Sequence, residues 1–477
     1  MANQSRIFQS FGGVRQDEND YIASPDSSPD ACNMNTLDGS LTVATGFSRV
    51  VPTTLTPEAP FRRLYVYARP TGNVYLIADR DCLYAYNAAE ARWLMLYQLG
   101  YAIDADLFDF LELKIGSDTR LLIAYGKEPM VLWDGESDTV TSFGSAEQGS
   151  NLLMNFIELY YGRLFAAGNP NFPCRLYWSQ VPGDGRTVED WTAADANENV
   201  SGGHVDVGTD SDPITGLFAL SNQLLIFKRD SLYRLLGDRP SNYRILPVDA
   251  SFAQPLHTAC VRYADRLYFL TKQGLYFYDG QTVRRPSHYR ALYRLLKTAN
   301  LAQCAAVACG DTLYFACKEH ASSAYNDLLI EYDVPRDCFM LRRGFSIAGL
   351  CAVHGVLYLL TGTGKVAAFD DSTTYDGAPI DAWWTTPRID LGHKGVEKVL
   401  SNLFCTGTGD CFAVDVETRD TRFSTIARFS DDDMAVTDVL LRGAGRVFRM
   451  RFRNVDGEPF SLDANVTALF ESQLRPM

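Results

Sequence analysis

The side chains best suited to binding a metal ion are three aspartates that lie close together, Asp206, Asp210 and Asp212. Clustered carboxylate oxygens are the ligands that Ca²⁺ prefers. Aspartates in turns, however, more often hydrogen-bond to their own backbone. The six histidines are scattered along the chain, with no two at ligand spacing. We therefore predict no metal-binding residues.

Two further motifs contain residue types found in catalytic or phosphate-binding loops. Asp184-Gly185-Arg186-Thr187, followed by Trp191, resembles the aspartate box of sialidase propellers, but the residue order differs and the motif does not repeat. Thr361 to Val366 resembles a phosphate loop, but its first glycine is misplaced and no Ser or Thr follows the lysine. We expect both to be turns, and we predict no catalytic residues, no cofactor-binding residues, no cofactor and no enzymatic activity.

Composition excludes several function classes for this chain of 477 residues. It has 44 Lys+Arg against 58 Asp+Glu, a formal net charge of −14. This balance argues against a surface that coats nucleic acid and against a polybasic membrane patch. The uncharged stretch Gly344 to Gly364 is rich in glycine and predicts two short strands rather than a membrane span. We expect a soluble protein with no membrane partner.

Eleven cysteines, an odd number, form no CxxC pair, and most lie in apolar strand-like runs. Buried free cysteine behaves as a small hydrophobic residue. The cysteine pattern therefore predicts free thiols and folding in a reducing cytoplasm.

The chain is organised by a hairpin of two apolar strands that repeats along the sequence. Apolar strands begin at residues 74, 121, 164, 224, 267, 313 and 357, and each is followed by a turn and a second apolar-aromatic strand. The starts are 43 to 47 residues apart, except for one interval of 60. A hairpin repeated at this period is typical of a four-stranded propeller blade. We predict an all-β fold, a β-propeller of about seven blades, within a range of six to eight.

The repeats divide the chain into three regions. We predict an N-terminal extension at 1–60, the propeller at 61–375 with a loop-rich insertion at 169–212, and a C-terminal β-sandwich-like domain at 376–477. Within the propeller, apolar residues at helical spacing predict a helix between His288 and Gln303. His354 lies in an apolar run, and we expect it in the core.

Several segments, in order along the chain, resemble a known family. They are Phe11-Gly12-Gly13-Val14, Ser27 to Asn35, Asp38 to Leu41, Arg163 to Pro170, Arg175 to Ser179 with Trp191, Val205 to Gly208, Pro213 to Leu217, Leu224 to Lys228 and Ile380 to Gly392. The family is that of the tailed-bacteriophage β-propeller tail proteins, which are the tail nozzle or packaged-DNA stabilisation proteins of short-tailed phages.

This resemblance implies a structural role in the virion tail and no catalytic residues. It implies a homo-oligomeric ring, with six copies expected, below the portal and its adaptor. The ring would continue the DNA channel, retain the packaged genome, and anchor tail fibres or spikes after assembly in the host bacterial cytoplasm. Lysine and arginine bind DNA phosphates, so an acidic wall suits a channel through which DNA must slide.

Two alternatives remain open. A tail-tip propeller could bind a glycan or receptor on the host surface, with Trp178 and Trp191 as the candidate platform, although packing is the commoner role of such tryptophans. A propeller glycosidase would need two carboxylates facing each other across the axial funnel, and no such pair stands out in the sequence.

Overall fold

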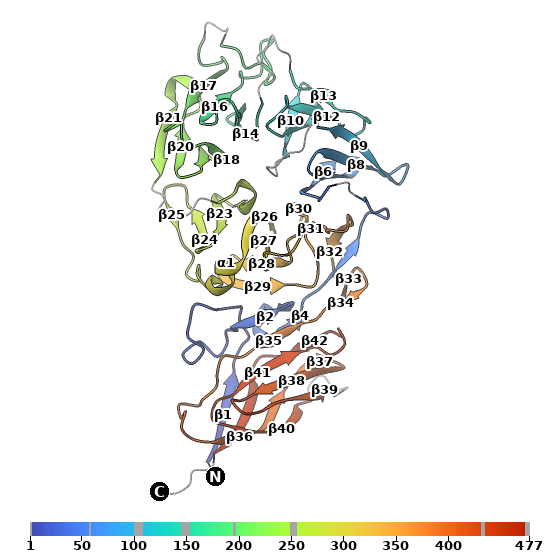
Figure 1. Ribbon diagram of the computed structural model, residues 1–477, viewed down its shortest axis with the longest axis vertical. Helices are drawn as coiled ribbons and strands as arrows, with labels where there is room; N and C mark the ends of the chain where they lie inside the picture. The colour runs from blue at the N-terminus through green and yellow to red at the C-terminus, as the bar shows by residue number, and fades with distance from the viewer. Residues whose placement is uncertain are drawn as a thin grey trace.

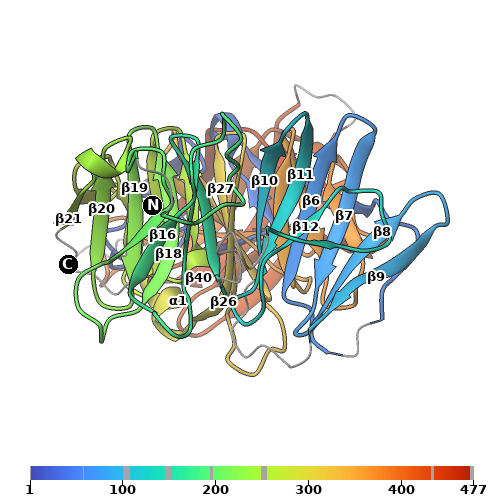
Figure 2. The same cartoon turned by 90° about the horizontal axis from the view of Figure 1, so that it is seen from above.

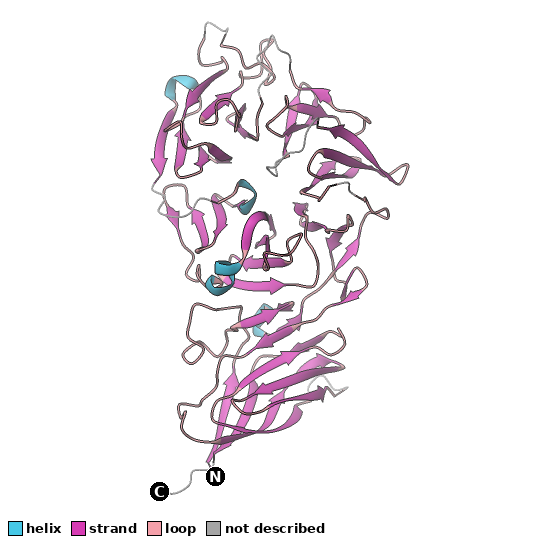
Figure 3. Cartoon of the chain, viewed as in Figure 1, coloured by secondary structure: helices cyan, strands magenta, loops and turns pink. Residues whose placement is uncertain are grey.

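The computed structural model describes residues 2–56, 59–99, 108–144, 153–193, 197–248, 255–430 and 435–472. Figure 1 shows two stacked units, a ring of sheets at one end and a second β unit at the other, where both termini lie. Almost all regular structure is strand, as Figure 3 shows. The predicted all-β class is therefore confirmed.

The ring is a propeller of seven sheets, and within the first six the strands follow one another in sequence order. Blades one to three contain β6 (Arg63–Arg69), β7 (Gly72–Ala78), β8 (Cys82–Asn87) and β9 (Arg92–Gln98); β10 (Asp109–Ile115), β11 (Asp118–Ala124), β12 (Val131–Trp133) and β13 (Thr141–Ser142); β14 (Phe156–Tyr160), β15 (Arg163–Ala167), β16 (Arg175–Trp178) and β17 (Gly203–Asp206). Blades four to six contain β18 (Ile214–Leu220), β19 (Gln223–Lys228), β20 (Leu232–Leu236) and β21 (Arg244–Val248); β22 (Cys260–Tyr263), β23 (Arg266–Thr271), β24 (Gly274–Tyr278) and β25 (Val283–Arg284); β26 (Asn300–Cys309), β27 (Thr312–Lys318), β28 (Leu328–Asp333) and β29 (Cys338–Arg342). The first strands lie nearest the centre of the ring (Figure 1), and the prediction of about seven blades is confirmed.

Each repeated apolar run is the second strand of its blade, where both faces are buried. The fourth blade, with β18, β19, β20 and β21 side by side, is seen in Figure 2. All six residues of its second strand, β19, are buried. Leu224 and Ile226 pack towards blade three, whereas Leu225 and Phe227 pack towards blade five. Alternate side chains of a strand point to opposite faces. A strand between two neighbouring blades is therefore apolar on both faces, which explains the continuous runs.

The seventh blade is completed by a strand from the N-terminal segment. It contains β30 (Gly349–Val353), β31 (Val356–Leu360), β32 (Val366–Phe369), β5 (Phe47–Arg49), β33 (Thr374–Tyr375) and β34 (Ala378–Pro379), in that spatial order. β5 pairs antiparallel with β32, with Phe47 opposite Phe369. The Phe47 ring lies 5.2 Å from Phe345 and 5.0 Å from Tyr375, centroid to centroid. Residues before the first blade thus close the ring.

The second unit is the predicted β-sandwich, built from both ends of the chain. Its sheets contain β1 (Ala2–Phe8), β43 (Val466–Ser472), β36 (Lys398–Cys405) and β40 (Thr437–Gly445); β2 (Asp30–Cys32), β35 (Trp383–Thr385), β41 (Arg449–Arg453), β38 (Cys411–Glu417) and β39 (Arg422–Arg428); β3 (Met34–Asn35), β4 (Leu41–Val43), β42 (Phe460–Leu462) and β37 (Gly407–Gly409). The predicted extension at 1–60 is therefore shared between the sandwich, which contains β1 to β4, and blade seven, which contains β5. β2 to β5 are only two or three residues long and carry no periodic signal, so the sequence did not reveal their pairings.

Two local predictions need correction. A helix lies between His288 and Gln303 as predicted, but it is only α1 (Tyr293–Thr298), because β26 begins at Asn300. Among the described residues, the other helical segments are the short 3₁₀ turns η1 (Leu37–Gly39), η3 (Pro240–Asn242) and η4 (His257–Ala259). His354 is exposed, in the turn between β30 and β31, with φ 51°. Gly355 follows it with φ 78°, and paired left-handed residues form the tight turns of hairpins.

The cysteines agree with the prediction of free thiols. All eleven are free, and eight of them are buried. In the described part of the chain, no helix is long and apolar enough to cross a membrane.

The closure of the ring is tested by Phe47→Ala. Removing a buried ring from a packed aromatic cluster costs about 3–5 kcal/mol, so we expect a loss of this size in the free energy of unfolding measured by urea titration. Phe172→Ala is the matched control, because Phe172 is 47% exposed and should cost less than about 1 kcal/mol. Equal losses in the two variants would contradict a special role for β5.

Candidate functional site

Three of the segments that carry the family resemblance, Phe11 to Val14, Ser27 to Asn35 and Ile380 to Gly392, meet where the propeller joins the sandwich. Phe11 packs edge-on against Trp384, with ring centroids 5.0 Å apart, and against Phe452 at 6.0 Å. The fully buried Trp384 donates its indole N–H to the carbonyl oxygen of Gly12 at 2.9 Å. This aromatic cluster fixes the N-terminal segment to the sandwich.

The glycines of the same motif allow the segment to approach blade six. A Cβ atom on Gly13 would lie well under 3.0 Å from the Cys338 Sγ and from the carbonyl oxygen of Phe339. The next residue, Val14, donates its amide to that carbonyl at 2.8 Å. A Cβ atom on Gly12 would likewise lie under 3.0 Å from the carbonyl oxygen of Asp26. Only glycine fits at these two positions, for reasons of contact distance.

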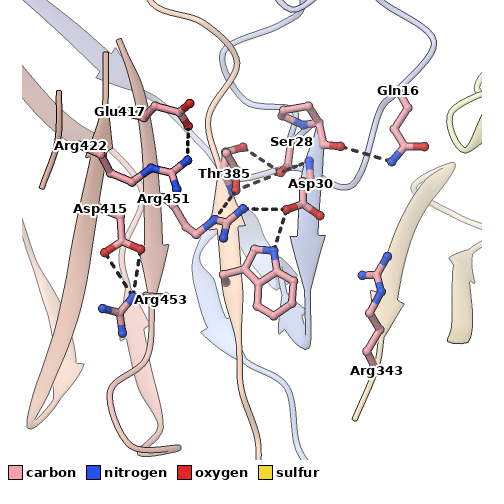
Figure 4. Close-up of polar contacts among 12 residues, drawn as sticks. Gln16, Ser28, Asp30, Arg343, Thr385, Asp415, Glu417, Arg422, Arg451 and Arg453 are labelled. Atoms are coloured by element: carbon pink, nitrogen blue, oxygen red, sulfur yellow. Dashed lines mark hydrogen bonds and ion pairs between the residues drawn. The ribbon is translucent and has the colours of Figure 1, made fainter. Parts of the chain in front are cut away.

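Polar contacts extend the junction along β2 and β35 (Figure 4). The Ser28 hydroxyl donates to the carbonyl oxygen of Thr385 at 2.8 Å. Asp30 accepts hydrogen bonds from the indole N–H of Trp383 at 2.9 Å and from the Arg451 guanidinium at 3.0 Å. The N-terminal strand is thereby held to the sheet by side chains as well as by its ladder.

Asn33 links both units through one buried amide that is 2% exposed. Its Nδ2 donates to the carbonyl oxygens of Asp381, at 2.7 Å, and Arg343, at 3.1 Å. Its Oδ1 accepts from the Arg343 amide at 2.9 Å and from the Tyr375 hydroxyl at 3.0 Å. Its φ of 53° lies in the left-handed region, where Asn is more tolerated than most residues. We call these contacts of residues 11–33 with both units the junction clamp.

Two buried cations hold the predicted insertion, 169–212, in the same way. The guanidinium of Arg163 donates to the carbonyl oxygens of Ser179, at 2.6 Å, and Ser201, at 2.8 Å. The Lys228 ammonium donates to the carbonyl oxygens of Val207 and Thr209. A buried charge is tolerated when it is hydrogen-bonded, and these bonds fix the loop backbone.

A second group of buried charges lies on the inner strands of the propeller. Asp109 Oδ1 is 3.8 Å from His257 Nε2, and its Oδ2 accepts the Ile157 amide at 3.0 Å. Burial raises the pKa of the Asp109 carboxyl, but the contact with His257, the charge of Arg63 and the Ile157 amide outweigh burial and hold the pKa below 3.8. Asp109 is therefore ionised and stabilises the inner ring.

The neighbouring strand carries Glu158, whose Oε2 is 3.0 Å from the Arg262 Nη1. Burial raises the pKa of Glu158 above 4.5, and the charge of Asp109 adds to this rise, although Arg262 opposes it. A pair of carboxylates with divergent pKa values is typical of glycosidases. Here both side chains are buried, and the cavity of about 220 Å³ among the inner strands of blades one, six and seven is lined by neither.

Two of the three aspartates considered for calcium have separate structural partners. Asp206 pairs with Arg175 at 2.6 Å, and Asp212 accepts from the Asp230 amide at 2.8 Å and from the Ser231 hydroxyl. Within the described residues, Asp79, Asp81 and Cys82 are the only group of three side chains close enough to share a metal ion. Asp79 Oδ1 there accepts the amides of Asp81, at 3.0 Å, and Cys82, at 2.7 Å, which is the geometry of an Asx turn.

The remaining sequence motifs are structural. Trp178 and Trp191 are both buried, and Trp178 packs against Tyr243 at 5.4 Å, so neither forms an exposed platform. Asp184 pairs with Arg186 in a surface turn. Thr361 to Val366 forms the turn between β31 and β32, where Lys365 pairs with Asp376 at 2.7 Å.

Comparisons with known proteins concern the fold alone. A scan of family models and a search of curated proteins find no match. Among solved structures, the chain is similar to the WD40 repeats of RRP9 (10% identity, TM-score 0.44, 68% of this chain and 99% of that chain) and to BamB from Moraxella catarrhalis (10% identity, TM-score 0.38, 78% and 98%). Raptor from Chaetomium thermophilum is similar at 9% identity and TM-score 0.46, over 69% of this chain and only 30% of the Raptor chain.

The close approach at the junction clamp is tested by Gly13→Ala. The added methyl group overpacks the contact with blade six, and overpacking costs about 1–3 kcal/mol. We expect a lower midpoint of thermal unfolding and faster limited proteolysis of the N-terminal segment. Gly395→Ala is the control, because a Cβ there meets no atom within 4 Å. Equal behaviour of the two variants would contradict the steric account.

The inner-ring charges are tested by the pH dependence of stability in Asp109→Asn. Because the folded pKa of Asp109 lies below 3.8, its stabilising contribution is complete above that pH and is lost as the pH falls through the folded pKa. Urea titrations should therefore show the wild-type advantage over Asp109→Asn shrinking below pH 3.8.

Glu158→Gln provides the opposite case. The folded pKa of Glu158 lies above 4.5, so the wild type should gain stability relative to this variant as the pH falls through the folded pKa towards 4.5. Parallel profiles for the wild type and both variants would contradict these assignments.

Proposed function

We propose that the chain is a structural subunit of a bacteriophage virion tail. Copies form a homo-oligomeric ring, with six expected, that continues the DNA channel below the portal and its adaptor. The ring retains the packaged genome and anchors fibres or spikes. The proposal includes no catalytic step.

The observation that carries the proposal is the role of the residues behind the resemblance. Phe11, Gly12, Gly13 and Trp384 belong to the junction clamp, and Arg163 and Lys228 hold the insertion. Each is consumed by an internal contact that stiffens the chain. Such use of side chains for rigidity suits a subunit that must keep its shape under the pressure of packaged DNA.

The charge balance gives independent support. A wall rich in lysine and arginine would bind DNA phosphates and release them only at higher salt. The chain has 14 more acidic than basic residues, and many of its arginines are already paired, as Arg175 is with Asp206 and Arg343 with Glu319. These features favour a channel along which DNA moves without being held.

The alternative of glycan recognition by the propeller insertion loses its candidate residues. Trp178 and Trp191 pack in inter-blade cores, and a buried indole offers no face to a sugar.

Cryo-electron microscopy of the assembled particle that contains this chain tests the proposal. We expect several copies arranged around the tail axis, enclosing a pore lined by carboxylates, between the adaptor and the fibres. A single copy at the periphery of the particle would overturn the proposal.

A further inference from the structure

A groove of about 570 Å³ lies where the five-stranded sheet of the sandwich meets the N-terminal segment and α1. Asp20 and Asp30 contribute to it from the N-terminal segment, Arg294 from α1, and the remaining walls come from β35, β38, β39 and β41. Grooves of this size between domains are common sites of small-ligand binding. The contacts of the junction clamp leave this groove open.

One wall is a row of arginines produced by strand alternation. In β41, Met450 and Phe452 are fully buried in the sandwich core. Arg449, Arg451 and Arg453 alternate with them and therefore point outwards, on one face of the sheet. The sequence Arg-Met-Arg-Phe-Arg thus places three guanidinium groups in a line, of which those of Arg449 and Arg451 line the groove.

Each arginine of this face has a carboxylate beside it. Arg449 pairs with Asp20, and Arg451 pairs with Asp30 at 3.0 Å. Two further pairs are shown in Figure 4. Arg453 pairs with Asp415 of β38 at 3.0 Å, and Glu417 of β38 pairs with Arg422 of β39 at 3.1 Å. Donors and acceptors therefore alternate along the groove.

The charges that line the groove cancel. Four arginines line it and four carboxylates line it: Arg294, Arg422, Arg449 and Arg451 against Asp20, Asp30, Asp415 and Glu417. A polyanion would meet as many like charges as opposite ones, and an apolar ligand would bury charged groups at a large cost. A neutral ligand rich in hydroxyl groups has neither penalty.

A hydroxyl group both donates and accepts a hydrogen bond, whereas guanidinium only donates and carboxylate only accepts. A hydroxyl placed beside an Arg–carboxylate pair can bond to both members without breaking the pair. Thr385 and Ser424 add hydroxyls to the wall.

We propose that this groove binds a short neutral oligosaccharide. The inference does not rest on the proposed ring, because it follows from the alternation of charges in a single copy.

The probe is an array of neutral di-, tri- and tetrasaccharides of glucose, galactose, mannose and N-acetylglucosamine, with sulfated and sialylated oligosaccharides beside them. The full chain should bind at least one neutral member, and isothermal titration calorimetry with that sugar should give the same Kd at low and high salt. We expect the double variant Glu417→Gln/Arg422→Gln to weaken binding at least about tenfold, or about 1.4 kcal/mol.

The same strand provides the matched control. Arg428 lies on β39 as Arg422 does, is 74% exposed against 75%, and pairs with the exposed Asp410, outside the groove. Asp410→Asn/Arg428→Gln should leave the Kd unchanged. Because all four side chains are exposed, both double variants should fold like the wild type, which circular dichroism checks.

Four results would overturn the proposal. They are the absence of binding to every neutral sugar, binding only to acidic sugars with strong salt dependence, equal effects of the two double variants, and loss of self-association in Glu417→Gln/Arg422→Gln without any sugar binding. The last result would identify the groove as a contact between copies of this chain.

Discussion

A propeller is a closed ring, and its stability depends on how the last blade is joined to the first. In this chain the join is β5, which supplies the seventh blade with a strand from a segment that precedes the first blade. The same segment has already contributed β1 to β4 to the sandwich. Closure of the ring and completion of the sandwich therefore depend on one continuous stretch of backbone, and neither unit is complete without it.

Buried cations also hold distant parts of the backbone together in both units. Arg163 and Lys228 bind loop carbonyls in the propeller, and Lys398 does so in the sandwich, where its ammonium donates to the carbonyl oxygens of His393, Val396 and Arg446 at 2.7, 3.1 and 3.0 Å. Burial lowers the pKa of Lys398. Each of these cations donates to carbonyl oxygens of residues that lie outside the strands.

Much of the fold could be predicted from the sequence, because the second strand of each blade is apolar on both faces. The apolar runs predicted to begin at residues 224, 267 and 357 lie in β19, β23 and β31. The pairing of β2, β4 and β5 could not be predicted, since strands of three residues have no period and their partners in β35, β42 and β32 lie more than 300 residues away, as Asp30 and Thr385 do.

The groove and the inner-ring charges likewise depend on contacts between segments that are distant in the sequence. The outward alternation of Arg449, Arg451 and Arg453 is visible in the sequence, but their partners Asp20 and Asp30 come from the other end of the chain. Burial in the ring raises the pKa of Glu158, whereas contacts with residues from other blades lower the pKa of Asp109, and their own strands reveal neither effect. Local patterns predicted elements, whereas contacts across the chain created the sites.

The central claim is that residues shared by both units make the propeller and the sandwich one cooperative structure. Differential scanning calorimetry of the full chain tests it most directly. The account predicts a single transition whose calorimetric and van't Hoff enthalpies agree. Two separate transitions in the wild type, one for each unit, would contradict it.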